Sequence, residues 1–384
     1  MNRQGKSTLV FNSKPRVIGN YSVVGPKEGR GNFAQYFDRI LEDDTLGQPT
    51  YEKAECKLLE LCIDGAISNA KLKPSQIDCM VAGDLMNQIT SSSFAARSLN
   101  IPYLGVFGAC STMAESLMVG ATLIDGKYAN NVVCATVSHF SSAEKQFRYP
   151  LELGTQRPPT SQWTTTGSGA TVLAQNSSGV AITSATIGKV ADWNVTDVNN
   201  MGGAMAPAAF ETLWQHLNDL SIEPDYYDLI LTGDLGKLGS EVLIDLMENK
   251  GVHLGANYSD CGQMMFKNTQ KVFMGASGCG CGASVLNSYV LQRLKNRTLK
   301  RVLFIATGAL LSPLTCQQGE SIPCIAHAVV LKGENYVWCN FIPKSVFSWW
   351  FCVYAGASFN NNHQNDECPH FSYFFNPRCY IRNF

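Results

Sequence analysis

The sequence lacks a strong charge of either sign. Its 384 residues carry 30 Lys and Arg against 31 Asp and Glu, a formal net charge of −1. Proteins that bind nucleic acid or anionic lipid through their surface charge need a basic patch or face. The composition therefore argues against a nucleic-acid partner and against broad attraction to an anionic membrane.

Long apolar segments are also missing. Residues 1–13 contain no apolar core of the kind that a secretory signal peptide needs, so no cleaved signal peptide is expected. Before residue 340, no stretch offers 18 apolar residues without a charge, which is about the length that crosses a bilayer. The main body of the chain is therefore not expected to span a membrane.

The fourteen cysteines lack a pairing pattern. They are scattered and mostly lie inside apolar runs, where a thiol behaves as a small hydrophobic group. Cys279 and Cys281 form a doublet with no second pair at zinc-binding spacing, so no metal site is expected. A reducing compartment fits this usage best.

What the sequence does contain is a regular alternation of β-branched runs and helical patterns, which predicts an α/β protein with a mostly parallel sheet. A polar break at 175–179 divides the pattern into two similar halves, 1–178 and 179–335, and suggests an internal duplication. The first half has expected helices at 53–71 and 113–123 and expected strands at 78–82, 131–138 and 169–174. The second has expected helices at 208–220 and 283–295 and expected strands at 180–187, 227–232, 301–307 and 325–331.

The composition changes abruptly after residue 335. Residues 339–384 hold four cysteines and thirteen aromatic residues but only five charged ones, and no helical or strand period persists. We expect the folded protein to end near residue 335 and 336–384 to be out-of-frame translation or a disordered extension. A membrane-docking tail rich in Trp and Phe is the functional alternative.

The segment 105–112 places Cys110 where an extended stretch meets a buried helix. The positive end of a helix dipole and unpaired N–H groups would lower the pKa of such a thiol and favour an anion beside it. The same pattern also fits one more buried structural cysteine. Both interpretations stay open at this point.

Ala109-Cys110-Ser111-Thr112 resembles the nucleophile motif of the thiolase superfamily, in particular its ketoacyl synthase III branch, and 166–173 resembles the glycine-rich strand that closes the first half there. The resemblance implies a duplicated five-layer αβαβα fold with two mixed, mostly parallel sheets, usually a homodimer, with the pocket between the halves. Enzymes of that branch pair the cysteine with His and Asn from the second half. This sequence has Gly233-Asp234 and Cys279 at those positions, so condensation chemistry is not expected.

Three further segments, 23–29, 82–89 and 321–327, resemble the stage V sporulation protein AD family of endospore formers. The resemblance implies non-catalytic binding of dipicolinic acid (pyridine-2,6-dicarboxylate), free or as its calcium chelate, for uptake into the developing spore. It leaves open a further role in release at germination. Its implied partners are integral-membrane SpoVA channel proteins at the inner spore membrane. The alternatives are an acyltransferase or thioesterase that uses Cys110 with Asp234 or His139 as base, and a purely structural subunit.

A planar dianion needs N–H donors and an arginine in a partly apolar slot. We expect Cys110, Ser111 and Thr112 to supply helix-end donors. Arg148 or Arg157 would pair with a carboxylate, although either could instead be a solvated loop arginine. No cofactor is expected besides the ligand and its calcium.

The remaining candidates come from other strand ends. Asp84 is expected to face the pocket as an acceptor or calcium ligand, or else to cap a helix or turn. Ser138 and His139 are candidate pocket walls, and His139 could equally be a structural histidine. From the second half, Gly233, Asp234 and Cys279 complete the predicted ligand-binding set.

Overall fold

The computed structural model describes residues 2–333 except for 149, 155 and 177. The expected tail at 336–384 lies outside the described residues. Two runs of five strands have the same spatial order, which is the third, second, fourth, fifth and first strand of each run along the chain. The first run comprises β3 (Arg16–Val24), β5 (Cys79–Asp84), β6 (Tyr103–Gly105), β7 (Asn131–Ser138) and β9 (Gly167–Ala174). The second comprises β10 (Val180–Thr186), β11 (Leu229–Thr232), β12 (Tyr258–Asp260), β14 (Arg301–Ala309) and β15 (Cys324–Gly333).

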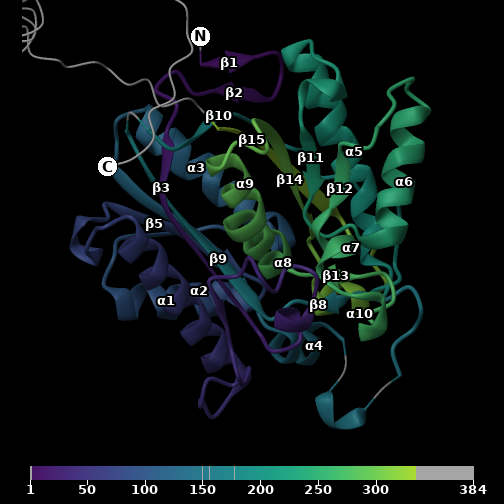
Figure 1. The fold of residues 1–384 in the computed structure, drawn as a ribbon. Coiled ribbons are helices and arrows are strands. Elements are labelled where there is room, and N and C mark those ends of the chain that lie inside the picture. The colour runs from purple at the N-terminus through teal and green to yellow at the C-terminus, as the bar shows by residue number, and fades with distance from the viewer. Residues whose placement is uncertain (1, 149, 155, 177, 334–384) are drawn as a thin grey trace, which may run out of the picture. The chain divides into compact units, whose positions relative to one another are not determined.

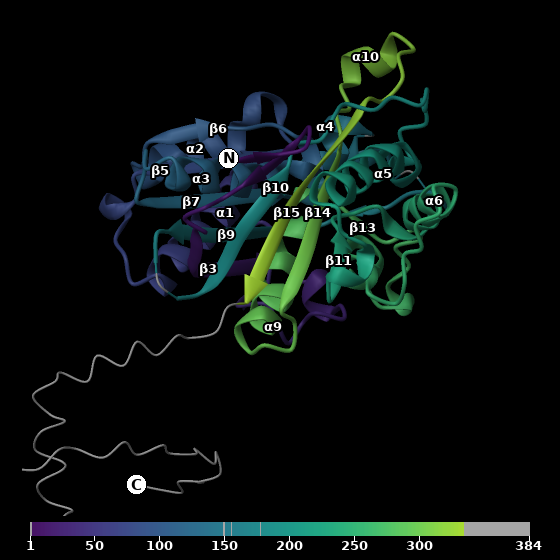
Figure 2. The same cartoon turned by 90° about the horizontal axis from the view of Figure 1, so that it is seen from above.

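The prediction of two mostly parallel sheets is wrong in detail, because both runs belong to one mixed thirteen-stranded sheet. They are joined where Val180 pairs with Val17 and Ala181 with Arg16, between β10 and β3 (Figure 2). In this sheet the antiparallel pairs outnumber the parallel ones, since β9 and β15 each run antiparallel to both neighbours. Small strands complete the picture: β1 (Arg3–Gln4), β2 (Thr8–Val10) and β4 (Arg39–Ile40) at this sheet, and β8 (Trp163–Thr164) paired with β13 (Ala276–Ser277).

Helices cover both outer faces and fill the space between the two runs (Figure 1). α1 (Tyr51–Asn69) and α2 (Thr90–Leu99) pack on the first run, and α5 (Met201–Leu220) with α6 (Gly236–Glu248) packs on the second. α3 (Thr112–Asp125) and α8 (Cys279–Val285) contact strands of both runs and share one buried core with them. The shorter helices are α4 (Phe140–Phe147), α7 (Cys261–Met265), α9 (Leu291–Lys295) and α10 (Pro313–Gln317).

Local sequence explains most of these elements. The Thr50 hydroxyl caps α1 by accepting a hydrogen bond from the Lys53 amide at 3.3 Å. The helix predicted at 208–220 begins seven residues earlier, at Met201, where Asn200 provides the cap. Pro207 lies in the second turn of α5, and its ring explains why the sequence pattern suggested a later start. No helix in the described part of the chain is long and apolar enough to cross a membrane.

Candidate functional site

Cys110 lies in a tight turn that leads into α3. The preceding Ala109 has a φ of +49°, a left-handed conformation that is strained for a residue with a Cβ. The turn is closed by the Ser111 amide, which donates to Gly108 O at 3.0 Å, and by the hydroxyls of Ser111 and Thr112, which donate to Gly108 O (2.7 Å) and Ala109 O (2.6 Å). The Thr112 amide also donates to Ala109 O. The donors expected of Ser111 and Thr112 are therefore used inside the turn.

The second half of the chain brings a carboxylate to the Cys110 thiol. Burial raises the pKa of Cys110 well above its ordinary value, and the nearby Asp234 carboxylate and Cys279 thiol raise it further. The expected lowering of this pKa by a helix dipole is wrong. A partial charge at a helix end does not outweigh desolvation together with a nearby carboxylate.

Several donors hold Asp234 in this position. Its Oδ2 accepts hydrogen bonds from the Gly278 amide at 2.9 Å and the Ser277 hydroxyl at 3.2 Å, and its Oδ1 accepts from the Thr307 hydroxyl at 2.8 Å. Burial raises the pKa of Asp234 to about 6, while these donors and the thiol act against that rise.

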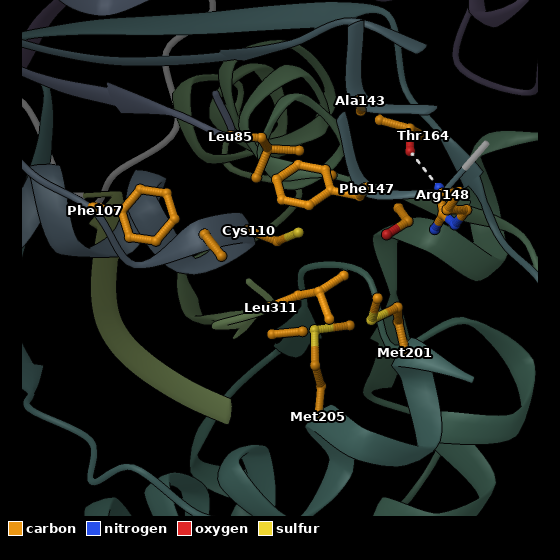
Figure 3. Close-up of a pocket in the computed structure, with 14 residues that line it drawn as sticks. Leu85, Phe107, Cys110, Ala143, Phe147, Arg148, Thr164, Met201, Met205 and Leu311 are labelled. Carbon is orange, nitrogen blue, oxygen red and sulfur yellow. Dashed lines mark hydrogen bonds between the residues drawn. The ribbon is translucent and has the colours of Figure 1, made fainter. Parts of the chain in front are cut away.

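Cys110 borders a small, largely apolar cavity between the two halves (Figure 3). Its volume is about 50 Å³, which holds only a few water molecules. A larger chamber of about 330 Å³, next to the turn 87–89, shares the side chains of Leu85, Phe107, Phe147 and Leu311 with it. The small cavity is lined by Leu85, Phe107, Ala109, Cys110, Ala143, Phe147, Arg148, Thr164, Met201, Met205, Ser277, Gly278, Ala309 and Leu311.

Arg148 is the one charged side chain among these lining residues. It is nearly buried, and its Nη1 lies 2.6 Å from Glu144 Oε1 and 3.5 Å from the Thr164 hydroxyl. Its Nε has no hydrogen-bond partner among the residues that the structure describes. Arg157, the other predicted arginine, lies 2.8 Å from the same Glu144 oxygen and borders a separate cavity of about 160 Å³.

Three predicted pocket residues instead support the backbone. Asp84 accepts the amides of Met86 (2.8 Å) and Ser92 (2.7 Å), so it is the cap that the sequence left as its alternative role. The Ser138 hydroxyl donates to Thr165 O at 2.7 Å and accepts from the Gly280 amide at 3.0 Å.

His139 is likewise a capping residue. Its Nδ1 accepts the Ser141 amide at 3.2 Å, and its Nε2 lies 2.9 Å from Asp44 O. Asp84, Ser138, His139, Asp234 and Cys279 were all predicted in the pocket wall, and none of them is among the residues that line this cavity. Gly233 also lies behind the wall, where its carbonyl accepts from the Cys281 thiol at 3.4 Å.

The apolar wall was not predicted from the sequence. Phe147 comes from α4, and Met201 and Met205 come from the first turns of α5, before the start of the predicted helix at 208. Leu85 directly follows the end of β5 and lies three residues after the end of the predicted strand 78–82, and this position was the available signal. No group of three or more His, Cys, Asp or Glu side chains in the described residues is arranged to hold a metal ion.

Comparison with known proteins shows which family this sequence matches. The family model of stage V sporulation protein AD matches residues 5–332. The stage V sporulation protein AD of Bacillus subtilis (strain 168) is 44% identical over 332 residues, which are 86% of this chain and 98% of that protein.

The solved structures support the fold. The 3-oxoacyl-[acyl-carrier-protein] synthase III of Aquifex aeolicus VF5 superposes with a TM-score of 0.53 at 12% identity, over 83% of this chain and 99% of that one. The acetamide-bound OleA of Xanthomonas campestris gives a TM-score of 0.56 at 13% identity, over 84% and 100% of the two chains. The α/β fold is thus thiolase-like, and the chain belongs to the stage V sporulation protein AD family.

Proposed function

We propose that this protein binds dipicolinic acid, free or as its calcium chelate, for uptake into the developing spore, with release at germination as a second use. The observation that carries the proposal is the cavity beside Cys110, whose apolar wall is interrupted by the single charged group of Arg148. An aromatic ring with carboxylates needs this combination of apolar surface and one well-placed cation.

The wall suits a planar ring. Phe107 and Phe147 offer aromatic surfaces, and Met201 and Met205 are flexible thioethers that can shift to admit a ligand. Such movement is required because the present volume of about 50 Å³ is too small for the ring. The adjoining chamber of about 330 Å³ gives it an approach. A chelated calcium ion would arrive with the ligand, since both Asp84 oxygens are already occupied by amides.

The state of the thiol supports binding without catalysis. Ionising Cys110 would place a thiolate next to the Asp234 carboxylate in a buried site, which is why its pKa is raised. A nucleophilic cysteine needs the opposite arrangement, a base that becomes positively charged beside it. Acyl transfer through Cys110 is therefore the weaker candidate.

The proposed partners are a second copy of the chain and the integral-membrane SpoVA channel proteins at the inner spore membrane. The edge strand β6 pairs only with β5 among the described strands. Leu104 and Phe107 beside this edge are each nearly half exposed, as is Phe94 on α2. An unpaired edge flanked by apolar side chains is a ready surface for strand pairing in a homodimer.

Calorimetric titration with pyridine-2,6-dicarboxylate, with and without calcium, tests the proposal. We expect saturable binding that falls at least about tenfold in Arg148→Met, because a charge-assisted pair is lost. Arg39→Met, at an exposed arginine of β4, is the matched control and should bind as the wild type does. The absence of any binding heat or competition under either condition would refute the proposal.

A further inference from the structure

We propose that Glu144 is an internal carboxylate that neutralises Arg148 and Arg157 and so competes with a ligand carboxylate for the positive charge of Arg148. The inference rests on the proposed binding function and concerns its control. In this proposal Glu144 lowers the affinity of the site for the ligand without contacting the ligand itself.

The geometry is that of one acceptor shared by two cations. Glu144 Oε1 lies 2.6 Å from Arg148 Nη1 and 2.8 Å from Arg157 Nη1. The side chains of Glu144 and Arg148 are 9% and 8% exposed, so little water competes for this contact. Two guanidinium groups that converge on one carboxylate oxygen form the arrangement that would also capture a carboxylate from solution.

The three residues lie in the wall between two cavities. Arg148 borders both the Cys110 cavity and the outer cavity of about 160 Å³, whereas Glu144 and Arg157 border the outer one. Arg148 is therefore the residue at which a ligand carboxylate in the Cys110 cavity and the Glu144 carboxylate would compete. Figure 3 places Arg148 at the edge of the Cys110 cavity, next to Thr164.

The charges explain why the resident carboxylate matters. The charged side chains that border these two cavities or contact Cys110 are Arg148, Arg157, Glu144 and Asp234, and their formal charges cancel. A dianion gains little from a neutral cluster, and it gains much more once the charge of Glu144 is withdrawn. Arg148 has unused donor capacity for a new partner, since its Nε is unpaired among the described residues.

Arg157 is held in place even without Glu144. Its guanidinium lies 5.6 Å and 5.2 Å from the ring centres of Phe140 and Trp163, which stack on each other at 3.7 Å. This aromatic support keeps the positive charge near Arg148 when the carboxylate is lost or turned away.

The test compares Glu144→Gln with Glu152→Gln in the full chain. Glu152 is an exposed carboxylate on the following short helix, so the control removes the same charge from the same segment. We expect Glu144→Gln to bind pyridine-2,6-dicarboxylate about tenfold more tightly than the wild type does, and Glu152→Gln to bind as the wild type does. The gain should be smaller for pyridine-2-carboxylate, which carries one negative charge fewer.

Glu144→Asp is a second variant, because a shorter side chain keeps the charge but reaches the two arginines less well. It should show a smaller gain, and it keeps the test open if Glu144→Gln does not fold by circular dichroism. If the wild type binds the ligand and neither Glu144 variant binds it more tightly, the inference is overturned and the proposed function stands. Absence of binding in the wild type and in all variants overturns both.

Discussion

Asp84 and Asp234 each follow a glycine at the end of a corresponding strand, but only Asp234 directs its carboxylate to Cys110. Asp84 caps the backbone of its own half through the amides of Met86 and Ser92. In the second half this duty passes to Asp260, which accepts the amides of Leu235 and Gly236 at 2.9 Å each. The two halves share a strand order, but the carboxylates at the corresponding positions, Asp84 and Asp234, have different roles.

Replacing Asp234 by Asn should make Cys110 more reactive. Loss of the neighbouring negative charge lowers the pKa of the thiol, and each unit of lowering raises the thiolate fraction about tenfold. Iodoacetamide labelling at pH 8, followed by peptide mass spectrometry, measures the rate at Cys110. Cys110→Ala in the same background identifies the signal, and an unchanged labelling rate in Asp234→Asn would contradict the assigned role of the carboxylate.

Glu28 should make the protein less stable as pH rises. Burial raises the pKa of Glu28 to about 7 from an ordinary 4.5, so the folded state holds a proton that the unfolded state releases earlier. This contribution is fully present below pH 4.5 and is lost as pH rises to 7. Glu28→Gln keeps the acceptor for the Thr166 amide and should flatten this slope, with a gain of up to about 3 kcal/mol at pH 7.

Urea unfolding of the wild type and Glu28→Gln at pH 5 and pH 8 measures the effect. Glu42→Gln, which changes an exposed carboxylate just after β4, is the control and should leave the slope as it is. Equal differences between wild type and Glu28→Gln at both pH values would show that Glu28 does not titrate in this range.

Gly308→Ala should damage the turn that carries Cys110. A Cβ at this position of β14 would lie 2.0 Å from Gly108 O, a contact that only backbone movement can relieve. We expect a loss of about 2 kcal/mol in unfolding free energy and weaker ligand binding. Gly255→Ala is the control, because the nearest atom to its new Cβ is 3.4 Å away, and normal melting of Gly308→Ala would contradict the prediction.

Asp219→Ala should release the N-terminal arm. The Asp219 carboxylate on α5 accepts hydrogen bonds from the amides of Lys6 and Ser7 and the hydroxyl of Thr8, each at 2.9 Å. Their loss leaves several donors unpaired and should cost about 3 kcal/mol. Trypsin should then cleave after Lys6 faster than in the exposed control Asp225→Ala, and equal cleavage of the two variants would argue against this anchor.

Strands and helices with a continuous pattern could be predicted from the sequence. The strand expected at 131–138 has those bounds as β7, because this run of mostly apolar and β-branched residues is buried on both faces of a sheet covered by helices on each side. The helix expected at 283–295 starts at Cys279 and passes through a π-helical turn at 286–290. Glycines at 280 and 282 hid its first turn.

The chemistry of the site could be predicted less well than its location. The sequence predicts Cys110, Asp234 and Cys279 in one pocket. In the structure Asp234 and Cys279 lie near enough to Cys110 to raise the pKa of its thiol, but only Cys110 of the three lines the cavity. The direction of the thiol pKa depends on a carboxylate 124 positions away and on burial, and neither is visible in a local motif. The joining of the sheets depends on the two-residue contact of β3 and β10, which leaves no periodic signal.

That short contact has a consequence for how the molecule is built. With two residue pairs between β3 and β10, the halves are held together mainly by side chains of the helices between them, as the subunits of an oligomer are. The chain can be viewed as a dimer fused into one polypeptide, whose two halves now have different roles at the site. The first half carries the Cys110 thiol, and the second half carries the Asp234 carboxylate that raises the pKa of this thiol and so keeps it protonated.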